Sequence, residues 1–514
     1  MGKGTTIFRN IFFNLIVFIV CCISIIVAIL GENEMYQTLW LLPLGYMVIY
    51  FMSLAVLKDK VFRNIGYILF WGQSIIKCVI APLILCLGNY TSLFRDLQEQ
   101  YIFHSVLLML YEQLACTFVI AFASADKQRV KFIVPNMGGL PKLTFGTFIA
   151  MFSVFMFGIW IIVPSIQNNF VTIFDMFSSQ QMFLGYDYIS ANTSGASGRI
   201  FTTLILVLFK SFRIIFPFFI IRGLKERYGN AGSFVVSILV VLLQFLFISE
   251  TVAMALVVAF MLLSYMFRIY PKYQKTVIGL MVFSSAFAIF VLSLNFDFMS
   301  KWYGVGNITE YASQVLQSYV PGVCNTASIF RLDRVSRLSS LWDTLISTIP
   351  FQNTIFGSVS WTNDLNTVFT SVSGLGAQIC STIGGGWYIF GALGAPIFSM
   401  LFTYVSIVNG YKYSQTDNDL ERLLYLFMCI QSILGIGVYN IQTTITLWIQ
   451  TGVILWISTK LSAVRKVAGG GGGVTNYLLC QQIVEYFKLV GLAFQSAYQK
   501  LCFRCRALSI GGVA

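Results

Sequence analysis

Three arginines in one polar segment, Arg331, Arg334 and Arg337, are the residues best suited to chemistry. Their i, i+3, i+6 spacing places the side chains along one side of a helix. Guanidinium groups bind phosphate oxygens through paired hydrogen bonds, so this face suits a ligand that carries phosphate. A solvated basic face that pairs with Asp333 and Asp343 is the alternative interpretation.

A second set of cations lies inside the apolar run at 199–221. At about 100° per residue, Arg199, Lys210 and Arg213 fall on one helix face. A charge at the centre of a membrane helix costs about 2.5–3.5 kcal/mol on insertion scales. We therefore expect this face to line a polar cavity that binds an anion, with snorkelling or a buried ion pair as the alternative. Lys77 lies in another apolar run. It could join this cavity, but we favour a private partner, that is, a separate side chain that pairs with Lys77 alone.

No residue stands out as a general base. His104 is the only histidine, and histidine titrates near neutral pH, which suits a base. A single histidine at a membrane interface is more often structural. Asp333 and Asp343 are the other weak candidates, so the sequence leaves the identity of a base open.

The 11 cysteines do not suggest a disulfide framework. Most of them lie in apolar runs, where cysteine behaves as a small hydrophobic residue. Cys502 and Cys505 form a lone C-x-x-C, whereas a zinc site usually takes four ligands at characteristic spacing. We expect no metal site and no cofactor.

Composition requires that a membrane surrounds these residues. Of the 514 residues, 57% are hydrophobic and 10% are charged, whereas an ordinary globular domain has roughly 25% charged residues. A surface this apolar needs lipid as its solvent. The net charge of +13 does not indicate a nucleic-acid partner, because the basic residues are dispersed in short clusters between apolar runs.

Apolar runs long enough to span a bilayer predict an all-α polytopic membrane protein with about twelve transmembrane helices. The stretch at 232–267 is interpreted as a hairpin that turns at Ser249 and Glu250. The first run is long for a signal peptide and has no small-x-small cleavage site. The predicted spans are 11–30, 39–57, 65–87, 102–123, 144–164, 199–221, 232–248, 251–267, 276–296, 387–408, 422–437 and 441–459.

The distribution of Lys and Arg predicts the orientation. These residues concentrate at the N-terminus and in every second connection, which places both termini in the cytoplasm. Two long connections, 165–198 and 297–386, then face outward. A connection as long as the second is typically functional, and its segments 309–320 and 331–349 have helical spacing. We expect the protein to act at the outer surface.

The end of the chain differs from the rest in its residue pattern. Residues 1–467 form the predicted transmembrane domain, and the glycine-rich stretch 468–473 is a flexible linker. Residues 474–514 form either an amphipathic helix on the membrane surface or non-native sequence. No function is assigned to them.

The large outer loop resembles a known pattern. The sequence VSRLSSLW at 335–342, with Pro350 and Gly357 after it, is similar to the external-loop pattern of the superfamily of Wzy-type oligosaccharide polymerases and O-antigen ligases. Residues 383–394 resemble the segment of that family that re-enters the membrane after the loop. The specific resemblance covers about 335–394, and the span layout of 1–467 is also similar.

This resemblance implies a bacterial inner-membrane glycosyltransferase of the GT-C type. Such an enzyme joins oligosaccharide repeat units carried on undecaprenyl diphosphate into a surface polysaccharide, such as O-antigen or capsule, without a metal or a nucleotide sugar. A polysaccharide chain-length regulator is a further expected partner. The expected catalytic residues are Arg337, Arg199 and Lys210, and the expected substrate-binding residues are Arg334, Arg331 and Arg213.

Two departures from the family pattern leave alternatives open. The ligase branch carries a histidine near the end of the loop, which this chain lacks there. The polymerase branch often has an acidic residue where Gly385 and Gly386 stand here. A ligase that passes glycan to an acceptor is the first alternative. A transporter or flippase for a lipid-linked sugar is the second, although transporters are expected to show internal repeats and none is evident.

Overall fold

The structure is a computed structural model, and all regular structure in its described residues is helical. The contacts discussed below lie within one compact unit, residues 1–138 and 146–455. The described residues are 3–31, 33–57, 64–88, 98–125, 158, 196–228, 231–246, 252–294, 306–320, 322–331, 338–349, 379–416 and 418–459.

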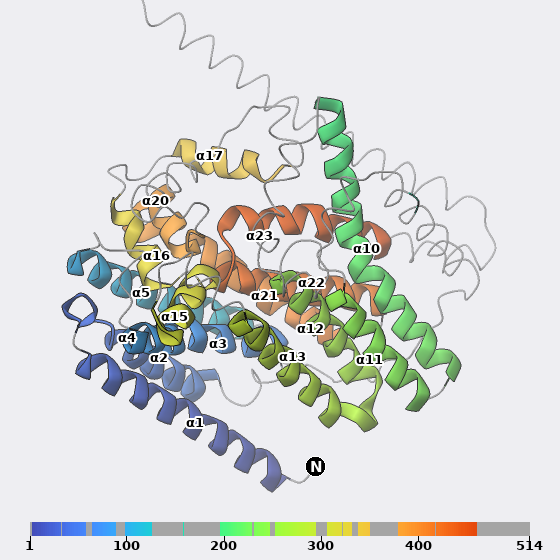
Figure 1. Cartoon of the computed structure of the whole chain (residues 1–514), viewed down its shortest axis with the longest axis horizontal. Helices are drawn as coiled ribbons and strands as arrows, with labels where there is room; N and C mark the ends of the chain where they lie inside the picture. Colours follow the sequence, from blue (N-terminus) through green and yellow to red (C-terminus); the bar gives the residue numbers. More distant parts are fainter. Residues whose placement is uncertain are drawn as a thin grey trace, which may run out of the picture. The chain divides into compact units, whose positions relative to one another are not determined.

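The helices follow one another along the chain as labelled in Figure 1. The N-terminal helices are α1 (Lys3–Leu30), α2 (Leu41–Leu57), α3 (Ile65–Ile75), a π-helical turn (Ile76–Ile80), α4 (Ala81–Gly88) and α5 (Glu99–Ala125). The central helices are α10 (Ala196–Tyr228), α11 (Ala231–Leu246), α12 (Val252–Ile269), α13 (Gln274–Leu294), α15 (Ile308–Tyr319), α16 (Val323–Ala327), a 3-10 helix (Ser328–Arg331) and α17 (Leu338–Ser347). The C-terminal helices are α20 (Thr382–Gly394), α21 (Ile397–Gln415), α22 (Asp419–Gly437), α23 (Ile441–Leu447) and a second π-helical turn (Trp448–Gly452).

Several helices are long and apolar enough to cross a membrane. Within the described residues, Glu34–Leu57, Ile65–Gly88, Glu99–Ser124 and Asp419–Gly437 satisfy this criterion singly, and the bent pair α20–α21 adds a fifth span if it is counted as one. The stretch 232–267 forms two helices, α11 and α12, that pack against each other as the hairpin interpretation requires. Apart from residue 158, the predicted span 144–164 lies outside the described residues, so the total of twelve stays a prediction.

The predicted span at 387–408 is bent within its length. Helices α20 and α21 meet at 106°. Gly391 has a φ of 75°, a conformation that disfavours any residue with a Cβ, and Pro396 precedes the first turn of α21. The hydropathy of this segment indicates only an apolar run. The backbone is broken by glycine and proline, whose effect is conformational.

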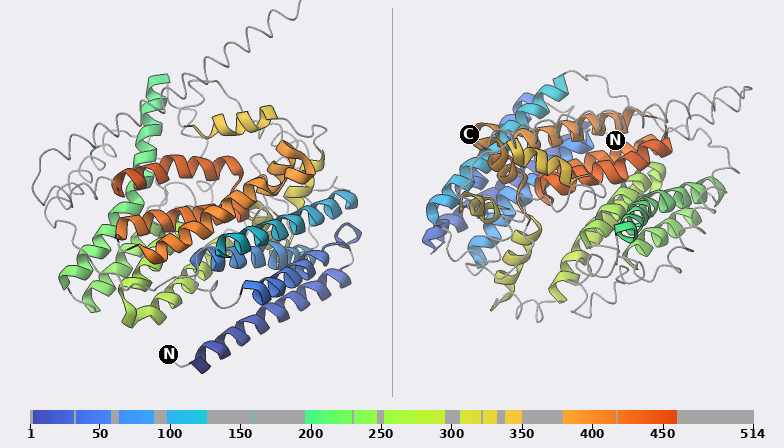
Figure 2. Two further views of the ribbon diagram at one scale, coloured as in Figure 1. Left: turned by 180° about the vertical axis from the view of Figure 1, so that it is seen from behind. Right: turned by 90° about the horizontal axis from the view of Figure 1, so that it is seen from above.

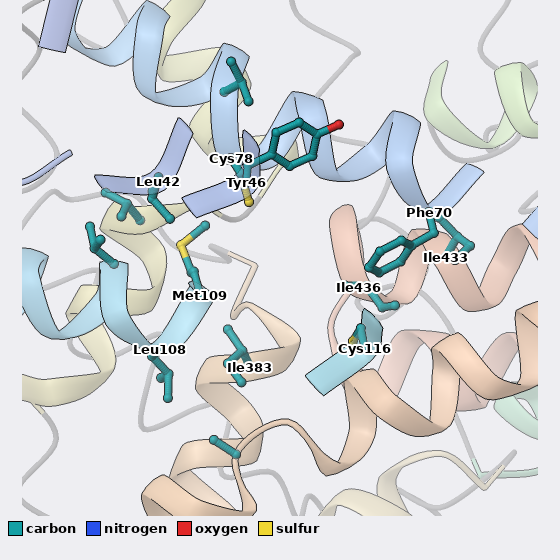
Figure 3. Close-up of a cluster of buried hydrophobic side chains, with 14 of the residues drawn as sticks. Leu42, Tyr46, Phe70, Cys78, Leu108, Met109, Cys116, Ile383, Ile433 and Ile436 are labelled. Carbon is teal, nitrogen blue, oxygen red and sulfur yellow. The ribbon is translucent and has the colours of Figure 1, made fainter. Parts of the chain in front are cut away.

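Two hydrophobic cores meet along α22. The first core combines residues of α1–α5 with residues of α16, α20 and α21, and the second combines α10–α13 with α22 and α23. Ile433 and Ile436, near the end of α22, belong to the first core, whereas Leu420 and Leu423, near its start, belong to the second. Figure 2 shows α10–α13 side by side, and Figure 3 shows Ile433 and Ile436 among side chains of the first core.

Small residues bring α3 and α21 into close contact. A Cβ on Gly66 would lie 2.7 Å from the Ser406 carbonyl oxygen, and a Cβ on Gly410 would lie 2.1 Å from the Asn64 amide oxygen. Asn64 caps α3 by accepting from the Gly66 N–H at 2.8 Å and donates to the Ile407 carbonyl at 3.0 Å. Such close backbone approach is typical of helix pairs in membranes, where van der Waals packing stabilises association.

The described parts of the large connection fold back onto the helix ends. Helix α15 packs against α4, α16 against α5, and α17 against α20 and α23. The Ser105 hydroxyl on α5 donates to the Val323 carbonyl at 2.7 Å. The helix predicted at 309–320 is present as α15, whereas the described helix in 331–349 begins only at Leu338. The connection is therefore part of the folded unit.

Candidate functional site

Aromatic side chains from three distant segments converge on the predicted outer side. Phe330, in the 3-10 helix of the large connection, stacks on Tyr101 with ring centroids 6.4 Å apart. Its ring also lies 5.7 Å from His104 and 4.7 Å from Trp387. We call Tyr101, His104, Phe330 and Trp387 the aromatic cluster. It joins the start of α5, the large connection and α20.

Polar contacts hold the connection against α20 beside this cluster. Ser381 caps α20 by accepting from the Gly384 N–H at 3.2 Å, and its hydroxyl lies 2.7 Å from that of Thr326. The Asn325 amide donates to the Ile379 carbonyl at 3.0 Å. Asn325 and Thr326 belong to α16, which has only five residues. Their position is therefore set by these tertiary hydrogen bonds.

Arg331 directly follows Phe330 and is half-buried at the end of the 3-10 helix. It is the first of the arginines predicted to bind phosphate. His104 is exposed. Aromatic ring faces can pack against the apolar faces of sugar rings, and a guanidinium can hold an anionic group beside them. The aromatic cluster can supply the first kind of contact, and Arg331, which directly follows Phe330 in the chain, can supply the second.

Asp343 lies on α17, which packs against α20. Partial burial raises the pKa of this carboxyl above its usual value. A raised pKa brings a carboxylate closer to the range that suits a general base at neutral pH. Among the predicted base candidates, Asp343 therefore gains a physical argument.

The two described cysteines nearest the aromatic cluster in sequence are poorly suited to act as nucleophiles. Cys324 and Cys380 flank the segments that form it, and both thiols are buried. Burial raises the pKa of each thiol to about 12. Because the thiolate is the nucleophile, these groups are inert at neutral pH and serve as packing.

The structure describes the remaining predicted site residues only in part. Arg334, Arg337 and Asp333 lie outside the described residues. Arg199 and Lys210 lie on α10, but their side chains are not among those described. The predicted convergence of these cations on one ligand therefore stays a prediction.

Arg213 contacts a helix end. Its guanidinium donates to the Gln244 carbonyl, in the last turn of α11, at 3.1 Å. The final carbonyls of a helix have no partner within the helix, and a cation there also complements the negative end of the helix dipole. The anion cavity is not needed to account for this contact, although the position of Arg213 on the predicted face is unchanged.

Lys77 has the private partner that the sequence favoured. Its ammonium lies 2.7 Å from a carboxylate oxygen of Glu112, and the two side chains are only 3% and 5% exposed. The second oxygen of Glu112 accepts from the Ser399 hydroxyl, and Lys77 also donates to the Ile436 carbonyl at 3.2 Å. We call Lys77, Glu112 and Ser399 the polar centre.

Sequence reasoning missed Glu112 and Ser399. Glu112 lies in the middle of the predicted span 102–123, so a carboxylate at membrane depth was the available signal. Its pairing with Lys77, which is 35 positions away, depends on how α5 lies against the π-helical turn that carries Lys77. The spacing of the two residues in the sequence does not predict that they pair.

A third charged cluster joins α10 to the start of α22. Asp419 lies 3.3 Å from Arg222 and 3.1 Å from Arg422, and Arg222 also pairs with Glu226 at 3.1 Å. The Arg422 side chain is 0% exposed and that of Asp419 is 4% exposed. Both arginines lie inside helices, Arg222 in α10 and Arg422 in α22. Tyr265 completes the cluster with a hydroxyl 3.5 Å from Asp419.

Comparison with known proteins adds no relative: no protein-family model, no curated protein and no solved structure matches this chain. The class that the structure supports is a helical protein with several helices able to cross a membrane.

Proposed function

We propose that the chain is a glycosyltransferase of the bacterial inner membrane that joins undecaprenyl-diphosphate-linked oligosaccharide units into a surface polysaccharide. One observation carries the proposal. The large connection folds onto α5 and α20 and forms an aromatic cluster directly before the arginine segment 331–337. A sugar-stacking surface beside permanent positive charge suits a substrate in which a glycan is linked to a diphosphate.

In the proposed reaction, a hydroxyl of the acceptor sugar attacks the anomeric carbon of the donor. The bond from that carbon to the diphosphate oxygen breaks, and the diphosphate leaves with the electron pair. Arg337, with Arg331 and Arg334, stabilises the developing negative charge without proton transfer. The acceptor proton passes to a base, for which Asp343 and His104 are the candidates.

Replacing Arg337 with alanine tests this proposal. We expect chain extension to fall by at least about 100-fold, because loss of one preorganised charge at a transition state typically costs that much. Polymer length in membranes is the measurement, and immunoblotting checks that the variant accumulates. Lys275→Ala, at the first turn of α13, is a control that removes a cation from a different part of the chain. Wild-type polymer in the Arg337→Ala strain would remove Arg337 from the mechanism.

The aromatic cluster makes a separate prediction. Trp387→Ala should raise the KM for the acceptor sugar about tenfold, because stacking on one aromatic ring contributes about 1 kcal/mol or more. Trp387→Phe keeps a ring and should retain most of the affinity. Equal KM values for the wild type and Trp387→Ala would assign Trp387 to packing alone.

A transporter or flippase is the second candidate, and two observations favour it. The bent pair α20–α21 is a broken span, and the polar centre places charges deep among apolar helices. A deletion strain distinguishes the candidates. A polymerase leaves single repeat units on the outer surface, a ligase leaves polymer on the lipid carrier, and a flippase leaves its substrate facing the cytoplasm.

A further inference from the structure

Helix α22 ends inside the first core, where its last carbonyls need partners. The Leu434 carbonyl accepts from the N–H groups of Val438 and Tyr439, each at 2.7 Å. The next two carbonyls, of Gly435 and Ile436, accept from side chains instead. In an apolar environment an unsatisfied carbonyl costs several kcal/mol, so these side-chain contacts are required for the helix to end here.

Lys77 supplies one of these contacts from a π-helical turn. It donates to the Ile436 carbonyl at 3.2 Å, and its charge complements the negative end of the α22 dipole. The π-helical turn Ile76–Ile80 adds a residue to the helical turn that contains Lys77. Such turns are rare and are frequent at functional sites. Glu112 neutralises the ammonium and itself accepts from the Ser399 hydroxyl, so the contact draws on the π-helical turn, α5 and α21 together.

Thr382 supplies the other contact from the first turn of α20. Its hydroxyl donates to the Gly435 carbonyl, and the Thr382 side chain is fully buried. The neighbouring Ser381 caps α20 and contacts the large connection through Thr326. The end of α22 is thus the common anchor of the polar centre and of the helix that carries Trp387.

We propose that Lys77 and Glu112 are positioning residues that act through the α22 terminus and Thr382 to hold α20, and with it Trp387, in the aromatic cluster. The role of Trp387 in binding sugar rests on the proposed function, whereas the coupling between the polar centre and α20 does not.

Hydrogen exchange measured by mass spectrometry on the full chain in detergent tests the coupling. In Lys77→Met and in Thr382→Val, the amides of 382–394 and 432–440 should exchange about tenfold faster than in the wild type, because a buried carbonyl loses its partner. The amides of α11–α13, in the second core, should not change. Thr382→Ser keeps the hydroxyl and is the matched control, with exchange expected near the wild-type rate.

Asp419→Asn is the reciprocal control, because it disturbs a buried ion pair at the opposite end of α22. It should accelerate exchange in α10–α12 and at the start of α22 and leave 382–394 unchanged. Faster exchange throughout the chain in Lys77→Met would mean that the polar centre contributes only to the overall stability of the protein. That result would overturn the proposal. Unchanged exchange in 382–394 would overturn it as well. If Lys77→Met does not accumulate, Thr382→Val against Thr382→Ser still decides between these outcomes.

Chain extension separates this proposal from the proposed function. A positioning role predicts that Thr382→Val raises the KM for the acceptor about as much as Trp387→Ala does, and that Thr382→Ser restores it. If exchange rises at α20 while Arg337→Ala still makes normal polymer, the coupling stands and the glycosyltransferase proposal fails. If exchange at α20 is unchanged while Arg337→Ala makes no polymer, the reverse holds.

Discussion

Replacing Asp419 with alanine is expected to lower the free energy of unfolding by about 3–5 kcal/mol, which is the usual cost of breaking a buried ion pair. Asp419 contacts both Arg222 and Arg422, whose side chains are 6% and 0% exposed. Without the carboxylate, two guanidinium groups lie near each other in a dry environment. Asp419 also stands in the first turn of α22, where a negative charge stabilises the helix dipole.

Denaturant titration of the purified protein in a mild detergent measures this effect. Glu226→Gln is the matched control. It removes a carboxylate that also contacts Arg222 but whose side chain is 32% exposed, so it should cost no more than about 1 kcal/mol. Equal unfolding midpoints for Asp419→Ala and Glu226→Gln would show that the cluster is solvated and contributes little.

Replacing Gly386 with alanine is expected to displace α20 and abolish chain extension. A Cβ at this position would lie 2.0 Å from the Ala395 carbonyl oxygen and 3.0 Å from its carbonyl carbon. Both atoms belong to the backbone, so no rotamer change relieves the collision. Overpacking of this kind typically costs about 1–3 kcal/mol. The larger effect falls on function, since Trp387 is the next residue.

Gly232→Ala is the control for this substitution, because a Cβ on Gly232 would have no neighbour within 4 Å. It should leave polymer length unchanged and should slightly stabilise α11, since alanine favours helix more than glycine does. Normal polymer from Gly386→Ala would mean that α20 tolerates displacement. The aromatic cluster would then not depend on the geometry of the α20–α21 bend.

The contact at Gly386 also bears on a difference between this chain and the family pattern that its sequence resembles. The polymerase branch often has an acidic residue where Gly385 and Gly386 stand. In this chain a side chain at 386 cannot fit beside Ala395. In the proposed glycosyltransferase, the base would therefore come from another element, and Asp343 on α17, which packs against α20, is one candidate among the described residues.

Lys77, which is buried, and Arg213 and Arg268, which are half-buried, share one structural use that spacing did not reveal. Lys77 donates to a carbonyl near the end of α22, Arg213 to one near the end of α11, and Arg268 to the Tyr413 carbonyl near the end of α21. Each helix end has carbonyls that lack partners within the helix. A charged side chain inside an apolar run can therefore serve the fold, by donating to a helix-end carbonyl, and need not bind a ligand.

The sequence by itself determined the helical class, the positions of most helices and the requirement for lipid. These follow from composition and from the length of apolar runs, which are local properties. It also indicated that Lys77 needs a partner, because a lone buried charge is too costly. It did not indicate the bend at Gly391 within the predicted span 387–408, where hydropathy and backbone conformation disagree.

Only the tertiary structure decided which residues meet. Phe330 reaches His104 across 226 positions and Trp387 across 57, and Glu112 reaches Lys77 across 35. These contacts depend on how the π-helical turn 76–80, α5, the 3-10 helix 328–331 and α20 pack, and packing is specified by shape and by close glycine contacts such as that at Gly386. The pattern of polar and apolar residues along the chain does not predict such pairs. The folded backbone, and not the spacing of two residues in the sequence, determines whether their side chains come into contact.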